Sequence, residues 1–151
     1  MENQENFLRE SIKVANDAVQ HGNHPFGAIL VLDGRIILSA ENSVITDKDV
    51  TCHAETNLVS LASKQFSRKE LKKSTLYAST EPCPMCATAI YWSGIGRIVF
   101  GCPETGLAKY AGQHFNLTIR DLFKNCSIPP EIIGPILQDE AEQIHRAYWK
   151  R

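Results

Sequence analysis

Two short stretches of the chain carry side chains that could bind a metal and move protons. The first contains His53 and Glu55, and the second, Pro82–Cys86, contains Cys83 and Cys86. Two cysteines three positions apart at a helix start can bring both sulfurs to one point, and the helix N-terminus favours their thiolates. With one imidazole nitrogen they make three protein ligands, the number found in catalytic zinc sites that leave a position open for water. These residues therefore predict one zinc ion per chain.

Glu55 lies two residues after His53, which places its carboxylate beside such a metal rather than on it. A carboxylate there can take a proton from a metal-activated water and pass it to the reacting molecule. The alternative is a structural zinc with four ligands, the fourth being Cys52, Cys102 or Cys126. No second Cys-x-x-Cys pair and no His-x(3–5)-His pattern supports that alternative. A non-catalytic, zinc-stabilised binding module is the remote possibility.

Helices and strands alternate along the rest of the chain. Apolar residues at helical or strand spacing predict helices up to about residue 20 and over 52–64, 84–93, 119–124 and 139–149, and strands over 28–32, 35–39, 75–79, 97–100 and 131–137. Asp33-Gly34 between the first two apolar runs indicates a tight hairpin. Strands that alternate with helices after an opening hairpin predict an α/β layered fold with a mixed sheet. The length of 151 residues predicts one domain spanning 1–151.

Composition limits the partners that the protein can have. The formal net charge is −1, whereas nucleic-acid-binding proteins usually carry a positive excess. Five cysteines are an odd number, and the polar N-terminus does not resemble a signal peptide. Because no window approaches the roughly 18 apolar residues of a membrane span, we expect a cytoplasmic protein with reduced thiols and no membrane partner.

The pattern H-x-E…P-C-x-x-C resembles the signature of zinc deaminases that act on nucleobases. The chain is similar to the cytidine/deoxycytidylate deaminase superfamily, in the branch that contains bacterial guanine deaminases, tRNA adenosine deaminases and fungal cytosine deaminases. The stretches that carry the resemblance are Pro25–Ala28, Ala40–Asn42, His53–Glu55, Thr80–Cys86 and Ala89–Trp92. The resemblance implies a three-layer α-β-α fold with a five-stranded mixed sheet, a zinc-dependent hydrolase that releases ammonia, and a homodimer.

The resemblance also implies residues that hold the substrate. It places Asn42 at the polar edge of the ring, Phe26 on one wall and the backbone N–H of Ala54 as a donor. Trp92 is expected either near the base or at the dimer seam. Tyr148 and Trp149 are expected either to cover the pocket as a lid or to dock the last helix onto the sheet.

The resemblance favours a small heterocyclic substrate, most of all a guanine-like purine. Bacterial guanine deaminases carry an acidic side chain on the loop after the fourth strand, whereas residues 107–120 contain none and offer His114 instead. A tRNA adenosine-to-inosine deaminase is the alternative. Residues 104–151 hold six basic and six acidic side chains, and this balance does not favour an RNA surface. The tRNA enzymes also usually carry a different residue at the position of Pro84 and a small residue where Tyr91-Trp92 stands here.

Overall fold

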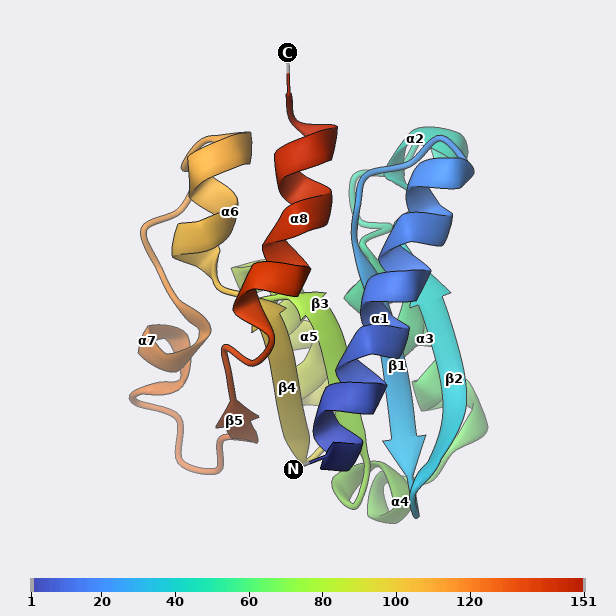
Figure 1. Cartoon of the computed structure of the whole chain (residues 1–151). Coiled ribbons are helices and arrows are strands. Elements are labelled where there is room, and N and C mark those ends of the chain that lie inside the picture. The colour runs from blue at the N-terminus through green and yellow to red at the C-terminus, as the bar shows by residue number, and fades with distance from the viewer. Residues whose placement is uncertain (1, 151) are drawn as a thin grey trace.

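The computed structural model describes residues 2–150, which form a five-stranded mixed sheet with helices on both faces (Figure 1). The strands are β1 (Gly27–Leu32), β2 (Arg35–Glu41), β3 (Thr75–Thr80), β4 (Arg97–Cys102) and β5 (Glu131–Ile133). The helices are α1 (Glu2–Gln20), α2 (Val44–Asp47), α3 (Ala54–Gln65), α4 (Arg68–Lys72), α5 (Pro84–Ser93), α6 (Glu104–Ala111), α7 (Ile119–Phe123) and α8 (Gln138–Tyr148). The strand order is β2-β1-β3-β4-β5, antiparallel up to β3 and parallel from β3 to β5.

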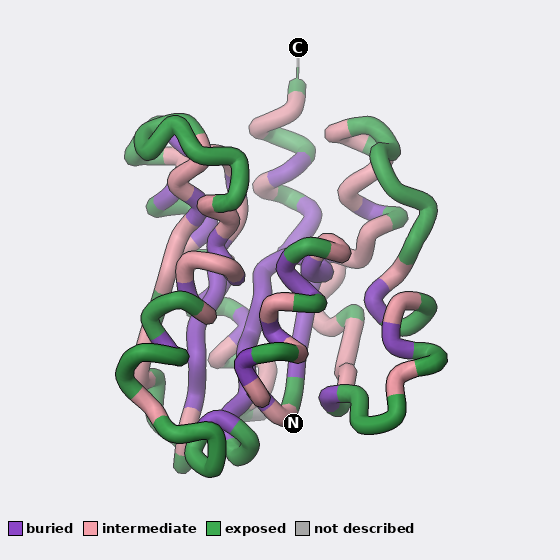
Figure 2. Tube along the Cα trace, turned by 180° about the vertical axis from the view of Figure 1, so that it is seen from behind, coloured by how far each residue is buried: buried purple, intermediate pink, exposed green. Residues whose placement is uncertain are grey.

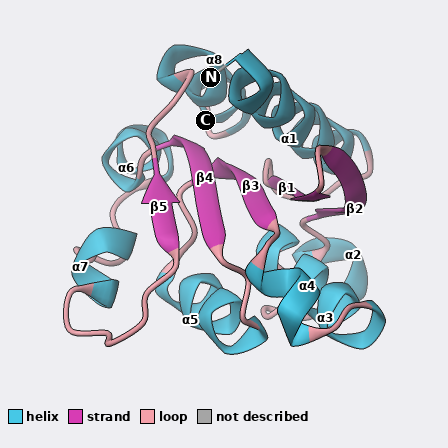
Figure 3. Cartoon of the chain, turned by 90° about the horizontal axis from the view of Figure 1, so that it is seen from below, coloured by secondary structure: helices cyan, strands magenta, loops and turns pink. Residues whose placement is uncertain are grey.

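The sheet separates two helical layers, as Figure 3 shows from below. Helices α1 and α8 cover one face, and α3 and α5 cover the other. The inner strands β1, β3 and β4 are buried along almost their whole length (Figure 2). This arrangement confirms the three-layer α-β-α fold and the five-stranded mixed sheet. Within residues 2–150, no helix combines the length and the hydrophobicity that crossing a bilayer requires.

The hairpin between β1 and β2 forms at the predicted dipeptide. Asp33 has φ 51° and Gly34 has φ 74°. Two consecutive residues with positive φ match the twist of the flanking strands, and Asp-Gly tolerates that conformation better than other pairs. The prediction of a tight turn here is confirmed.

Three short helices and one strand end differ from the sequence-based expectation. Helices α2, α4 and α6 were not expected from the sequence. Residues 131–137 were expected to form one strand, but β5 ends at Ile133. Pro135 has no N–H to donate to a sheet ladder, which explains the early end.

Candidate metal centre

The N-termini of α3 and α5 bring the predicted ligands together. His53 is the N-cap of α3 and Cys83 is the N-cap of α5, with Cys86 in the first turn of α5. Pro84 occupies the first position of α5, where its missing N–H costs no helical hydrogen bond. The Nδ1 atom of His53 lies 3.6 Å from Sγ of Cys83 and 3.5 Å from Sγ of Cys86. The sequence prediction of a His-Cys-Cys cluster that could hold one zinc ion is confirmed.

The spacing of these three atoms fits zinc. Bonds of about 2.0–2.3 Å in a tetrahedron place neighbouring ligand atoms roughly 3.5–3.8 Å apart. The three ligand atoms lie within 4.8 Å of one another, and the two measured nitrogen–sulfur distances fall in or near that interval. Cys52 does not belong to the cluster; its thiol faces Ser43 and Asp49. The described residues therefore offer three ligands and one open position.

The two thiols of the cluster have opposite pKa shifts. The pKa of Cys83 is lowered, first by its hydrogen bond with Cys86 and further by His53. The pKa of Cys86 is raised, first by its contact with Cys83 and then by burial. Without a cation one thiol keeps its proton, whereas a divalent metal stabilises both thiolates. Binding of a metal ion would therefore release the proton of Cys86.

Glu55 lies beside the cluster without joining it. Its side chain lines the pocket next to His53 and is only 5% exposed. Burial, followed by the charge of Cys83, raises the pKa of Glu55 to about 7. A carboxyl group with a pKa near neutrality can both accept and release a proton at physiological pH.

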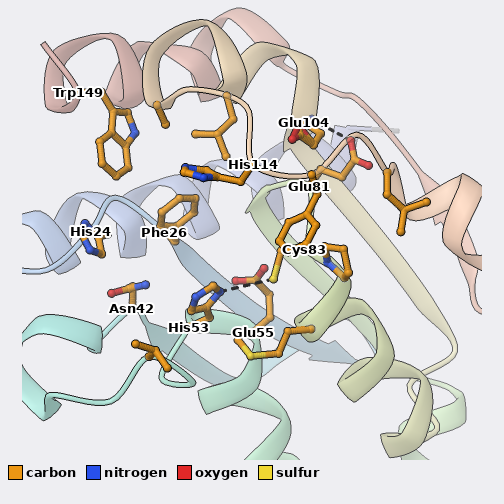
Figure 4. A pocket seen from close by; sticks show the side chains of 17 residues that line it. His24, Phe26, Asn42, His53, Glu55, Glu81, Cys83, Glu104, His114 and Trp149 are labelled. Carbon is orange, nitrogen blue, oxygen red and sulfur yellow. Dashed lines mark hydrogen bonds between the residues drawn. The ribbon is translucent and has the colours of Figure 1, made fainter.

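The cluster lies at one wall of a cavity of about 510 Å³ (Figure 4). Phe26 and Asn42 line this cavity, as expected. The Oδ1 atom of Asn42 accepts a hydrogen bond from the Val44 N–H at 3.1 Å, which turns the Nδ2 group toward the pocket. An amide held this way can donate to an acceptor on a bound ring.

Three of the expected substrate-binding residues do not line the cavity. Trp92 is 73% exposed and borders a different hollow together with Ile128. Ala54 is fully buried and Tyr148 lies behind the wall, where its hydroxyl is 3.0 Å from Nδ1 of His24. Within the described chain, Trp92 is therefore exposed and lies away from the cavity. Tyr148 contacts the lining of the cavity through His24.

Two acidic residues that the sequence analysis overlooked face the cavity, Glu81 and Glu104. The Oε1 and Oε2 atoms of Glu81 accept the N–H groups of Glu104 and Ile119, at 2.9 and 2.8 Å, and so hold the starts of α6 and α7. Burial, and then the charge of Glu81, raises the pKa of Glu104. His114 lines the same cavity, and Figure 4 shows it beside Glu104, across from the cluster. Glu104 precedes residues 107–120, the segment in which the family resemblance implied an acidic residue, although an acidic residue after Pro103 is a recognisable helix start.

Trp149 is the part of the C-terminal segment that reaches the cavity. Its ring stacks on His24, with centroids 5.5 Å apart. Its indole N–H donates to Nδ1 of His145 at 3.1 Å. Because Trp149 both lines the cavity and is anchored at its polar edge, its placement is compatible with the expected lid.

The fully buried His145 makes stability sensitive to acid. Burial lowers the pKa of His145 to about 4 from an ordinary value of 6.5, although the nearby Glu142 opposes the shift. The unfolded chain therefore takes up this proton near pH 6.5 and the folded chain only near pH 4. Stability from this residue is complete above about pH 6.5 and falls as the pH drops toward 4, by up to about 1.4 kcal/mol per pH unit. Urea unfolding of wild type and H145N from pH 7 to 4.5, at matched zinc content, should give the flatter pH dependence for H145N. Equal slopes would contradict the assignment.

The chain is similar in sequence and in structure to known proteins. A family model described as "Cytidine and deoxycytidylate deaminase zinc-binding region" matches residues 1–102, which include the cluster and Glu55. The chain is 44% identical over 149 residues to a "Probable cytosine deaminase" of Schizosaccharomyces pombe, covering 95% of this chain and 90% of that protein. It is 39% identical over 108 residues to a "Guanine deaminase" of Bacillus subtilis, covering 71% of this chain and 69% of that protein. A structure solved in a study of A-to-I editing by tRNA:A34 deaminases superposes with a TM-score of 0.77 at 29% identity, covering 93% of this chain and 99% of that one.

Proposed function

The chain belongs to the cytidine and deoxycytidylate deaminase family and is a zinc-type deaminase, and on this premise we propose that it removes the exocyclic amine of a small heterocyclic base, preferentially a guanine-like purine. The observation that carries the proposal is the position of His53, Cys83, Cys86 and Glu55 at one wall of a cavity of about 510 Å³. Apolar and aromatic side chains form most of the other walls, which suits a flat ring.

The proposed reaction exchanges an amine for oxygen. His53, Cys83 and Cys86 would hold the zinc ion, which when bound supplies Lewis-acid activation of water. The Glu55 carboxylate accepts one proton from the attacking water and delivers it to the ring nitrogen, and it then carries the second proton, from the new hydroxyl group, to the leaving amine. The Nδ2 group of Asn42 orients the ring by donating to it. The water oxygen remains on the ring as a carbonyl, ammonia leaves, and Glu55 ends in its starting state.

The polarity of the cavity supports a two-ring base. Its volume of about 510 Å³ admits a purine as well as a pyrimidine. Across from Glu55, Glu104 places a carboxyl group where it could accept the N–H donors on the far edge of a guanine-like ring, with His114 beside it (Figure 4). Cytosine is a second candidate, because the Schizosaccharomyces pombe relative that shares 44% identity is named a probable cytosine deaminase.

A tRNA substrate is the remaining alternative, and the likeness to the tRNA:A34 deaminase structure favours it. Two observations favour a free base instead. Trp149 lines the cavity and narrows the access that a folded RNA would need. The net charge of −1 supplies no positive excess for the phosphate backbone.

We also propose the homodimer that the family resemblance implied. The exposed Trp92 and Ile128, both 73% exposed at one hollow, are large apolar side chains that a second subunit could cover. The mass of the native particle in solution tests this proposal.

Ammonia release from a panel of bases tests the choice of substrate. We expect guanine or a related aminated purine to give a kcat/KM at least about tenfold above that of cytosine, because a purine presents further N–H donors that the Glu104 carboxyl group could accept. Guanosine and cytidine in the same panel show whether a ribose is accepted. Efficient turnover of cytosine with purines untouched would contradict the purine assignment and promote the second candidate.

A further inference from the structure

The His145 imidazole is buried in the layer between the sheet and the cavity and takes no part in the proposed chemistry. The side chain is 0% exposed. Its Nδ1 atom accepts the indole N–H of Trp149 at 3.1 Å, and its Nε2 atom lies 2.6 Å from Oγ1 of Thr80. An indole N–H can only donate, so Nδ1 must be the acceptor. The ring is therefore neutral, with its proton on Nε2 directed at Thr80.

The two hydrogen-bond partners of His145 belong to different parts of the protein: Thr80 to the sheet and Trp149 to the cavity wall. Thr80 is the last residue of β3, three residues before Cys83. Trp149 lines the cavity and stacks on His24. Phe26, another wall of the cavity, packs on the His145 ring at a centroid distance of 5.2 Å. His145 therefore links the end of β3, which leads to Cys83, with two aromatic side chains of the cavity wall, Phe26 and Trp149.

We propose that His145 is a positioning residue that fixes the indole of Trp149 across the cavity, a role that rests on the proposed function of the cavity as a base-binding site. Stacking on His24 fixes the face of the indole, but a stacked ring can still slide and rotate in its plane. The hydrogen bond to Nδ1 removes that freedom because it fixes the nitrogen edge. The hydrogen bond between His145 and Thr80 in turn fixes the imidazole. This geometry favours a prearranged wall over one that orders only when substrate binds.

The test uses proteins that all carry W92F, so that Trp149 is the single tryptophan of the chain. H145F keeps a ring against Phe26 but removes both hydrogen bonds. H145N restores an acceptor close to the position of Nδ1. H21F changes an exposed histidine that does not line the cavity and is the matched control. Acrylamide quenching of Trp149, zinc content, and kcat and KM for the best substrate are measured for each.

For H145F we expect bound zinc to be retained, Trp149 to become more accessible to acrylamide and KM to rise about 3- to 12-fold, the range that one net hydrogen bond corresponds to. Because Glu55 and the cluster are untouched, kcat should change less than about twofold. H145N should move both the quenching and the KM back toward the parent values, and H21F should match the parent. If no substrate is turned over, the proposed function fails, but quenching still reports on the position of Trp149.

Unchanged quenching in zinc-loaded H145F overturns the positioning role, whatever happens to KM. A fall in kcat with KM unchanged also overturns it, since that result places the effect on the chemistry. If H145F does not fold, W149F in the wild-type background removes the indole donor from the other end and keeps an aromatic ring. A W149F protein with unchanged KM would then contradict the proposal.

Discussion

Replacing Glu55 by glutamine is expected to lower kcat by about 10²–10⁴-fold while leaving zinc content and fold intact. Glutamine has nearly the same shape as glutamate but cannot carry a proton. The Glu55 side chain is buried and lines the cavity next to the cluster, and its pKa is raised to about 7, mainly by burial. The loss should therefore fall on turnover, with KM changing much less. Steady-state ammonia release, with zinc measured on the same preparation, checks this expectation.

E140Q is the matched control for that experiment, because Glu140 pairs with Arg9 on the surface, outside the cavity. The control should retain the activity of the wild type. Near-normal turnover of zinc-loaded E55Q would show that another group moves the proton. Loss of zinc from E55Q would instead show that Glu55 supports the metal.

The second large effect is expected when the cysteine ligands of the metal, Cys83 and Cys86, are removed. The wild-type chain should contain one zinc ion, and the combined C83A and C86A protein should contain almost none, because His53 alone cannot hold it. Activity should fall below detection. The melting temperature should fall as well, because a metal that binds only the folded state stabilises that state. Elemental analysis after dialysis, together with thermal unfolding, measures both effects.

C52A and C126A separate this account from a structural zinc in which one of these thiols is the fourth ligand. Neither thiol belongs to the cluster, so both variants should keep one zinc per chain. Zinc lost from C52A would make Cys52 a fourth ligand and contradict the open position. Zinc retained by the C83A and C86A protein would place the metal elsewhere.

The sequence was sufficient for the parts of the protein that local rules determine. Asp33-Gly34 turns as expected, since the two positive φ values are a property of the turn itself. The cysteine pair at the start of α5 is equally local, because the helix brings residues three apart onto one side. Pairing these cysteines with His53, thirty positions away, required the resemblance to a known family.

The overlooked residues depend on contacts that no local pattern encodes. His145 meets Thr80 across 65 positions, and nothing in the sequence around either residue indicates that contact. Glu104 faces the cavity because Glu81 holds the N-terminus of α6, again through a contact distant in sequence. The sequence alone therefore gives no reason to single out His145.

Helical geometry distinguishes between the two positions that were expected for Trp92. At about 100° per residue, Trp92 lies roughly 120° around α5 from the ligand Cys86. Cys86 and Ile90 are buried on the inner side of that helix, whereas Trp92 is 73% exposed. Helical geometry alone places the indole away from the metal, which leaves the surface as its position within one chain.

The most direct test of the central claim offers one preparation of the zinc-loaded protein both free bases and unmodified tRNA. Ammonia release and inosine formation are measured side by side, with E55Q as the blank. The proposed function predicts rapid release of ammonia from a free aminated base and little inosine in tRNA, because Trp149 narrows the cavity and the chain has no excess positive charge. Efficient inosine formation in tRNA with every free base untouched would contradict the account and establish the tRNA deaminase in its place.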